Sequence, residues 1–172
     1  MKLYFKGGEI RSWMSSDAEP ITGYANNYKI WINLRDGFPH PYTVNDAHQF
    51  IERAMEQKPE SFFAISIKGE AIGSIGFRVK TDVERVSAEI GYWLAEPFWN
   101  RGIMTSALKS VTDYAIKTHN LCRVYAVPYE WNHASFRVLE KAGYKLEGRM
   151  RKSAIKEDKI IDMLLYAFVP DI

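Results

Sequence analysis

The segment Ala88–Ala107, AEIGYWLAEPFWNRGIMTSA, has a residue pattern that could bind an anion. Its first half alternates with the period of two of a β-strand, and Glu96-Pro97 ends that strand because proline lacks a backbone donor. A turn with Gly102 follows, and apolar residues then recur at helical spacing from Ile103 onward. The first N–H groups of a helix have no internal partner and lie at its positive dipole end, and Arg101 adds a full charge.

Strand–turn–helix segments are also common where nothing binds, so this pattern alone leaves a purely structural role open. The glycine patterns of phosphate loops and of dinucleotide-binding folds are absent from the sequence. Metal-ligand spacing is also missing among the four histidines, so we expect no metal site; they are His40, His48, His119 and His133.

The wider sequence resembles the GNAT superfamily of N-acetyltransferases. The acyl-CoA-binding pattern of that superfamily is Gln or Arg, two residues, Gly, one residue, then Gly or Ala. Trp99, Gly102 and Met104 stand at these positions, so two of the three depart from the pattern. The longer string GYWLAEPFWNRGIMTSAL is much more similar to the RimJ/RimL-like branch of ribosomal-protein N-terminal acetyltransferases. Asn33–Ile51 and Asn132–Gly148 resemble the same branch, and the three segments follow the expected order over nearly the whole chain.

The resemblance implies a GNAT fold of the α/β (α+β) class, with a mixed, mostly antiparallel central sheet that splays in the middle and is flanked by helices. It also implies acetyl-CoA as the cosubstrate, with the pantetheine arm in the gap of the sheet and the pyrophosphate on the amides that open the next helix. Asn132 also stands where a helix cap is needed, and both roles can hold at once. The residues that the resemblance assigns to cofactor binding are Trp93, Leu94, Asn100, Arg101, Gly102, Ile103, Met104, Thr105 and Asn132.

Acetyl transfer from a thioester to an amine needs a base, stabilisation of developing charge and a proton for the leaving thiolate. Ser135 matches the serine near the cofactor sulfur in RimJ/RimL-like enzymes, and Leu139 stands where the superfamily often has a tyrosine acid. Glu89, on the strand beside the cleft, is the predicted base. Asp162 or a water relay are the alternatives, because Ala154 replaces the late-strand glutamate of that branch. A solvated glutamate and a solvent-facing serine are the simpler structural interpretations.

The irregular segment Arg35–Thr43 carries Phe38 and Tyr42, which either pin the loop or form a wall of the acceptor site. The resemblance favours the acceptor wall. The pKa of an α-amine is about 7.8 and that of lysine about 10.4, so far more α-amine is neutral at physiological pH. We therefore expect a primary amine as acceptor, with a protein N-terminus favoured. Small amines such as polyamines or aminoglycosides stay open, as does a non-catalytic acyl-CoA-binding protein on the same fold.

The composition predicts one domain over residues 1–172, because 47% apolar and 26% charged residues are ordinary for a globular protein. A net charge of +2 without long runs of one sign argues against direct nucleic-acid binding. Neither a signal peptide nor an apolar run of membrane length is seen, which predicts a soluble cytoplasmic protein without membrane association. The single cysteine, Cys122, excludes an internal disulfide and is expected in the core. Monomer and homodimer both stay open.

Periodicity and turn residues predict the order helices, three strands, helix, strand, helix and two strands after an N-terminal strand pair. The expected strands are a pair within Met1–Trp13 turned at Gly7-Gly8, then Ser61–Ile67, Ala71–Val79, Ala88–Leu94, Leu121–Pro128, Tyr144–Met150 and Ile160–Val169. The expected helices run from Ser15-Ser16-Asp17 to about Asn26 or Asn27, over Tyr28–Leu34, from a cap at Thr43 or Asn45, over Ile103–Thr118, and over Ala134–Ala142 before Gly143.

Overall fold

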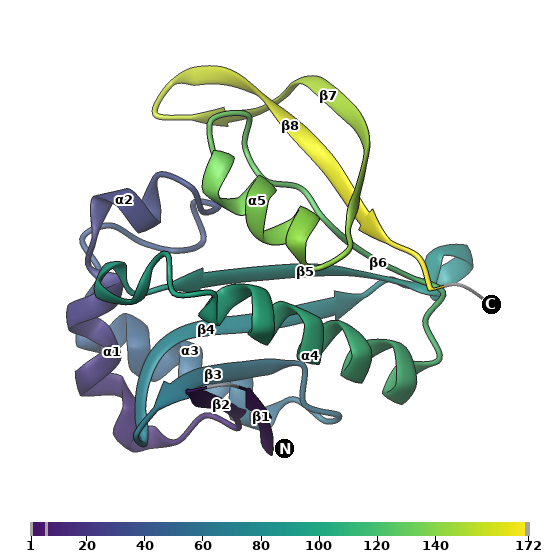
Figure 1. Cartoon of the computed structure of the whole chain (residues 1–172). Helices are drawn as coiled ribbons and strands as arrows, with labels where there is room; N and C mark the ends of the chain where they lie inside the picture. Colours follow the sequence, from purple (N-terminus) through teal and green to yellow (C-terminus); the bar gives the residue numbers. More distant parts are fainter. Residues whose placement is uncertain (1, 6, 171–172) are drawn as a thin grey trace.

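Alternating apolar residues build a sheet that organises the molecule. In the computed structural model, which describes residues 2–5 and 7–170, eight strands form one sheet in the order β1-β2-β3-β4-β5-β6-β8-β7 (Figure 1). Neighbouring strands are antiparallel except β5 and β6, which are parallel, so the expected mixed, mostly antiparallel sheet is confirmed. The strands are β1 Lys2–Phe5, β2 Gly8–Arg11, β3 Phe62–Ile67, β4 Glu70–Val79, β5 Ser87–Leu94, β6 Arg123–Ala126, β7 Lys145–Lys156 and β8 Lys159–Phe168.

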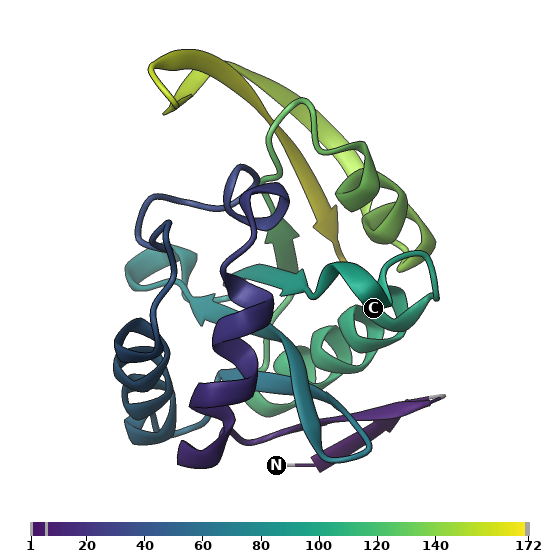
Figure 2. The same cartoon turned by 90° about the vertical axis from the view of Figure 1, so that its left-hand side faces the viewer.

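Helices cover both faces of the sheet. Figure 2 shows α1 and α3 on one side of the strands and α4 and α5 on the other. The helices are α1 Ala18–Ala25, α2 Tyr28–Trp31, α3 Val44–Glu56, α4 Ile103–His119 and α5 His133–Lys141, with short 3₁₀ turns η1 Ser15–Asp17, η2 Asp82–Glu84 and η3 Glu96–Phe98.

Each face of the sheet has its own apolar core. On the α4 side, Ile75 and Ile90 of the sheet pack in one cluster with Leu108 of α4. On the α1–α3 side, Ile21 and Ile51 pack in a second cluster with residues of the sheet. Because side chains alternate along a strand, each residue of β5 belongs to one face or the other.

The sheet opens between its two parallel strands. β5 and β6 pair at only three positions, from Ser87 opposite Arg123 to Glu89 opposite Tyr125. Beyond Glu89, β5 continues to Leu94 paired with β4 alone. The edge of residues 90–94 that faces β6 therefore lacks a ladder partner among the described strands, which is the gap that the family resemblance predicts.

Local sequence signals begin and end the helices as expected. The Thr43 side chain caps α3 by accepting from the Asp46 N–H at 3.3 Å, while the Asp46 carboxylate accepts from the Thr43 N–H at 2.8 Å. Asn132 caps α5, and Gly143 follows that helix at φ +94°, a conformation that glycine adopts easily. The N-terminal strand pair also forms, although Met1 and Lys6 of that prediction lie outside the described residues.

Several predicted details are wrong. Asp17 makes no cap for α1, because its carboxylate binds both terminal nitrogens of Arg11 at 2.7 Å. Cys122 is exposed, because it precedes β6 and Leu121 fills the core place instead. The strand expected at Leu121–Pro128 is shorter, and β7 is longer than predicted. β8 has the predicted length, begins one residue earlier, and forms one extended hairpin with β7.

The β7–β8 hairpin reaches back over the N-terminal third of the chain. Lys156, only 1% exposed, donates from Nζ to the Leu34 carbonyl and to Asp36, each at 2.9 Å. Its ammonium also lies 3.8 Å from the centroid of the Trp31 ring. The arc of the hairpin above α2 is visible in Figure 2. A buried charge needs such partners, so these contacts fix the loop that follows α2.

The described residues offer neither a membrane-spanning helix nor a metal cluster. Within residues 2–5 and 7–170, every helix is too short or too polar to cross a bilayer. The same residues contain no group of three or more His, Cys, Asp or Glu side chains that could hold a metal ion.

Candidate active site

The turn before α4 exposes main chain at the start of a long helix. Asn100 and Gly102 both have left-handed φ values, +60° and +74°, which a glycine tolerates best. The first helical bond runs from the Ser106 N–H to the Gly102 carbonyl at 3.1 Å, so the amides of Ile103–Thr105 have no partner within the helix. A side chain at Gly102 would meet no protein atom within 4 Å, so the space beside this turn is open.

Anchors hold this turn from the protein side. The Trp99 Nε1–H donates to the Leu94 carbonyl at 2.6 Å and joins the turn to the end of β5. Ile103 and Met104 are buried in the α4-side core, so their side chains point inward. Thr105 is half-buried, Asn100 is exposed, and the exposed Arg101 lies over the Phe98 ring. The turn therefore offers main-chain donors, with one exposed positive charge beside them.

Tyr92 and Ser135 meet on the α4–α5 side of β5. The Tyr92 hydroxyl and Ser135 Oγ share a hydrogen bond of 2.8 Å, and Asn132 Oδ1 accepts from the Ser135 N–H at 3.1 Å. Burial raises the pKa of Tyr92 above its ordinary value, although the bond from Ser135 opposes that shift. Tyr92 therefore keeps its proton at neutral pH. Leu139, at the expected tyrosine position, is fully buried in the core.

Glu89 lies on the opposite face of the same strand. Arg35 Nη2 donates to Glu89 Oε1 at 2.6 Å, and Lys80 Nζ lies 3.5 Å from Glu89 Oε2. The Glu89 side chain is 26% exposed. An ionised carboxylate has about four lone-pair sites, so these two contacts leave acceptor capacity for a proton.

The aromatic residues of the loop divide into two environments. Tyr42 is 6% exposed and packs in the α1–α3-side core, where burial raises its pKa to about 12. Phe38 is half-buried, stacks on Tyr42 at 4.8 Å between ring centroids, and meets Trp93 of β5 edge-on at 5.7 Å. Tyr42 thus pins the loop, while Phe38 extends an aromatic surface toward β5; their contact with an acceptor stays a prediction.

Both carboxylate oxygens of Asp162, the alternative base, already accept hydrogen bonds within the protein. Its Oδ1 accepts from the Lys152 N–H at 2.7 Å, and its Oδ2 accepts from Arg149 Nε at 2.5 Å. These bonds lower the pKa of Asp162, the backbone bond from Lys152 most strongly. A carboxylate held in its ionised form by fixed donors accepts a proton less readily, so Asp162 is a poor candidate for the base.

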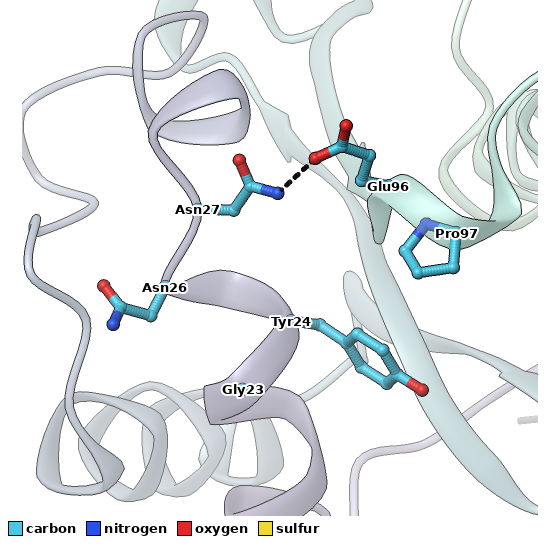
Figure 3. Close-up of a pocket in the computed structure, with 6 residues that line it drawn as sticks. All are labelled: Gly23, Tyr24, Asn26, Asn27, Glu96 and Pro97. Atoms are coloured by element: carbon cyan, nitrogen blue, oxygen red, sulfur yellow. Dashed lines mark hydrogen bonds between the residues drawn. The ribbon is translucent and has the colours of Figure 1, made fainter.

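A polar cleft of about 320 Å³ lies between the end of α1 and η3 (Figure 3). Glu96 reaches into it and accepts from Asn27 Nδ2 at 2.8 Å, and it also forms an ion pair with Lys29. The bond from Lys29 lowers the pKa of Glu96, and the bond from Asn27 adds to this effect. The lining residues are Gly23, Tyr24, Asn26, Asn27, Glu96 and Pro97. Both oxygens of Glu96 have partners, so the cleft supplies no free base.

The predicted residues therefore form two groups on the two faces of β5. The turn before α4, Tyr92 and Ser135 belong to the α4–α5 side, and Glu89 with Phe38 belongs to the α1–α3 side. Between the two faces the sheet is open beyond Glu89. A reactant in that opening could meet both groups at once.

Two residues that contact the predicted catalytic side chains were not predicted from the sequence: Tyr92, beside Ser135, and Arg35, beside Glu89. The alternating pattern predicts Tyr92 only as a strand residue, although its alternation with Trp93 already places it on the other face. Arg35 lies 54 residues before Glu89 in the chain, and no local pattern signals that pair.

Comparisons with known proteins agree on one family. The family described as "Acetyltransferase (GNAT) domain" matches residues 9–145. The ribosomal-protein-serine acetyltransferase of Escherichia coli is 31% identical over 167 residues, which cover 95% of this chain and 93% of that protein. A protein named uncharacterized N-acetyltransferase p20, from Bacillus licheniformis, is 26% identical over 171 residues, with 97% and 95% covered. The solved structure of Mycobacterium smegmatis RimJ in complex with CoA-disulfide has a TM-score of 0.82 at 24% identity, covering 94% of this chain and 81% of that chain.

Proposed function

The chain belongs to the GNAT family of acetyltransferases, and from that premise we propose that it moves an acetyl group from acetyl-CoA to a primary amine, a protein N-terminal α-amine in particular. One observation carries the proposal. The sheet opens beyond Glu89 and Tyr125, immediately before the turn that starts α4. We also propose that residues 1–172 form a single N-acetyltransferase domain, since the family match and the relatives span most of this length.

The opening and the turn fit acetyl-CoA. The unpaired edge of β5 beyond Glu89 can bind an extended amide chain as an added strand would. The N–H groups of Ile103–Thr105 can donate to a pyrophosphate, because they have no helical partner and lie at the positive end of the helix dipole. The open space beside Gly102 gives the phosphates room. When bound, the thioester supplies an activated acetyl carbon.

Glu89 takes the proton of the attacking amine in this proposal. It lies on the acceptor side of β5, held by Arg35 and Lys80 with lone pairs still free. The amine nitrogen forms its bond to the acetyl carbon, the carbon–sulfur bond breaks, and the amine proton passes to Glu89 directly or through one water. The ion pair with Arg35 fixes the direction in which the carboxylate points.

The Tyr92–Ser135 pair donates a hydrogen bond to the departing thiolate and keeps its own protons, and the released thiolate takes its proton from water. Because burial keeps the Tyr92 proton in place, its hydroxyl can donate to Ser135 while Ser135 donates onward. Asn132 holds the Ser135 backbone at the start of α5. A fixed donor of this kind gains strength as negative charge develops on the sulfur.

An α-amine acceptor is supported by two arguments. About a quarter of an α-amine is neutral near pH 7.4, against roughly 0.1% of a lysine side chain. A site whose one candidate base, Glu89, is already paired with Arg35 therefore loses less rate with an α-amine than with a lysine. The E. coli relative is named for acetylating a ribosomal protein on serine.

A thiol-release assay with matched amines tests the proposal. We expect turnover with acetyl-CoA and a peptide that has a free N-terminal serine, and far less with the same peptide blocked at its N-terminus and carrying an internal lysine. Spermidine and an aminoglycoside complete the panel. Preference for either small amine would replace the α-amine proposal, and binding of acetyl-CoA by calorimetry without turnover on any amine would indicate a non-catalytic acyl-CoA-binding protein.

A further inference from the structure

Gly91, in the middle of β5, has no structural explanation within the protein. It is exposed, its φ is not in the left-handed region, and a Cβ built there would meet no atom within 4 Å. Glycine in a strand interior weakens the strand, because it loses more backbone entropy and packs no side chain. An alanine could therefore occupy this position without a clash in the described structure.

Two glycines of the neighbouring strand show the contrast. A Cβ at Gly73 would lie 2.5 Å from the Trp93 carbonyl oxygen, and one at Gly76 would lie 2.4 Å from the Phe62 ring. Protein atoms therefore require glycine at both positions of β4. Gly76 pairs directly with Gly91 across the two strands, yet only Gly76 is confined by its neighbours. A glycine that leaves open space indicates that something outside the protein approaches the backbone there.

Strand alternation places this open space on the acceptor side. β5 and β4 pair without a register shift, so Glu89, Gly91 and Trp93 point to the same face. The Glu89–Arg35 ion pair borders the space at one end, and the Trp93–Phe38 ring contact borders it at the other. Four residues of strand separate the two borders by about 13 Å. The open space therefore lies between a charged group and an aromatic surface.

The strand edge at Gly91 is also the first part of the opening. Pairing of β5 with β6 ends at Glu89, so at Gly91 the β6-facing edge of β5 has no partner strand, while the other edge pairs with β4. Tyr92, the next residue, turns its hydroxyl to the other face and Ser135. A group above Gly91 is therefore next to the opening, two residues from Glu89 and one residue from Tyr92.

We propose that Gly91 is the floor of the acceptor site, and that the space above it receives the primary amine. This inference rests on the proposed acetyl transfer and adds the position and the width of the acceptor. A primary amine on an unbranched carrier fits between the ion pair and the rings, whereas a Cβ at Gly91 occupies the approach to the acetyl carbon. Glycine at position 91 thus keeps the approach to the acetyl carbon open, at a cost in strand stability.

Two variants and a matched control test the inference. Gly91→Ala and Gly91→Val should lower kcat/KM for a peptide with a free N-terminal serine by about tenfold and about a hundredfold, through acceptor KM and approach geometry. Acetyl-CoA affinity by calorimetry should stay within twofold, because the proposed cofactor contacts are main-chain groups of the β5 edge and of the turn before α4, whereas the new side chain points to the α1–α3 face. The melting temperature of Gly91→Ala should rise by roughly 1–3 °C, since alanine costs less entropy in a strand. Gly148→Ala and Gly148→Val in β7, where a Cβ also meets nothing within 4 Å, should leave kcat/KM unchanged.

The results separate the two proposals. Loss of acceptor turnover together with raised stability and unchanged acetyl-CoA affinity supports the acceptor floor. Unchanged kcat/KM in a folded Gly91→Val variant overturns it while the proposed function stands. Absence of turnover by the unaltered protein on every amine of the panel overturns the proposed function, and this inference with it.

Discussion

The two faces of β5 are built in different ways. The turn before α4 is made from one short stretch, and it offers main-chain amides, a left-handed glycine and a single anchoring indole. The α1–α3 face, where we propose that the acceptor binds, is held together by contacts between distant segments, since Arg35 and Glu89 are 54 residues apart and Lys156 and Leu34 are 122 apart. A main-chain site should tolerate side-chain exchange, whereas a side-chain site should not.

The largest expected effect is at Glu89. Glu89→Gln should lower kcat by about 10²–10⁴-fold, the usual contribution of a positioned general base. The remaining rate should rise with pH, because a larger fraction of the acceptor amine is then neutral without help. Glu147→Gln, which also removes a carboxylate paired with an arginine on the sheet, should change kcat little. A loss below threefold with an unaltered pH profile would favour a water relay.

Removal of either hydroxyl of the Tyr92–Ser135 pair comes next. Tyr92→Phe or Ser135→Ala should lower kcat by about 10–100-fold with acetyl-CoA affinity unchanged, because a hydrogen bond to developing charge contributes about 1.5–3 kcal/mol. The double variant should lose little more than either single variant, since the two groups act as one donor. Because burial raises the pKa of Tyr92, activity should not fall near pH 10 through loss of its proton. Additive losses in the double variant would separate the two roles.

The turn before α4 should respond to backbone change. Gly102→Val should weaken acetyl-CoA binding about tenfold, because a left-handed φ costs a non-glycine residue about 1–2 kcal/mol and the side chain enters the open space beside the amides. Gly69→Val supplies the control, with φ +86° and equally open surroundings in the β3–β4 turn. Calorimetry should find normal affinity in the Gly69 variant, and normal affinity in a folded Gly102 variant would mean that the phosphates bind elsewhere.

The smallest effect is expected at Arg101, a side chain on the main-chain site. Arg101→Ala should weaken acetyl-CoA binding by about two- to fivefold at low salt, because an exposed charge at a helix start contributes only a fraction of a kcal/mol. The difference should vanish at high ionic strength. Lys109→Ala, exposed further along α4, should have no effect at either salt concentration. A loss as large as that of Gly102→Val would remove the contrast between the two faces.

The same contrast explains what the sequence could predict. The order of helices and strands along the chain, the turn with Gly102 and the cap at Asn132 follow from local spacing, and the GNAT fold inferred from the family resemblance is confirmed. The face of each β5 residue also follows from alternation, because Tyr92 stands three positions after Glu89, an odd step that puts their side chains on opposite faces.

Contacts between distant segments could not be predicted in this way. The pairing of Arg35 with Glu89 depends on how the loop after α2 crosses the sheet. By residue type alone Asp162 is an available carboxylate, but the folded hairpin supplies Arg149 and the Lys152 amide as its partners. Each of these contacts depends on side-chain geometry between elements, which periodicity does not encode. The assignment of individual site residues to binding and catalysis stays a prediction for the experiments above.

The buried Lys156 gives the site an order of assembly in time. A chain grows from its N-terminus during synthesis, so the turn at Gly102 and the whole of α4 have been made by His119. Lys156, whose ammonium donates to the Leu34 carbonyl, is made 122 residues after Leu34. In synthesis, the contact that fixes the loop after α2 can therefore form only after the turn at Gly102 and all of α4 have been made.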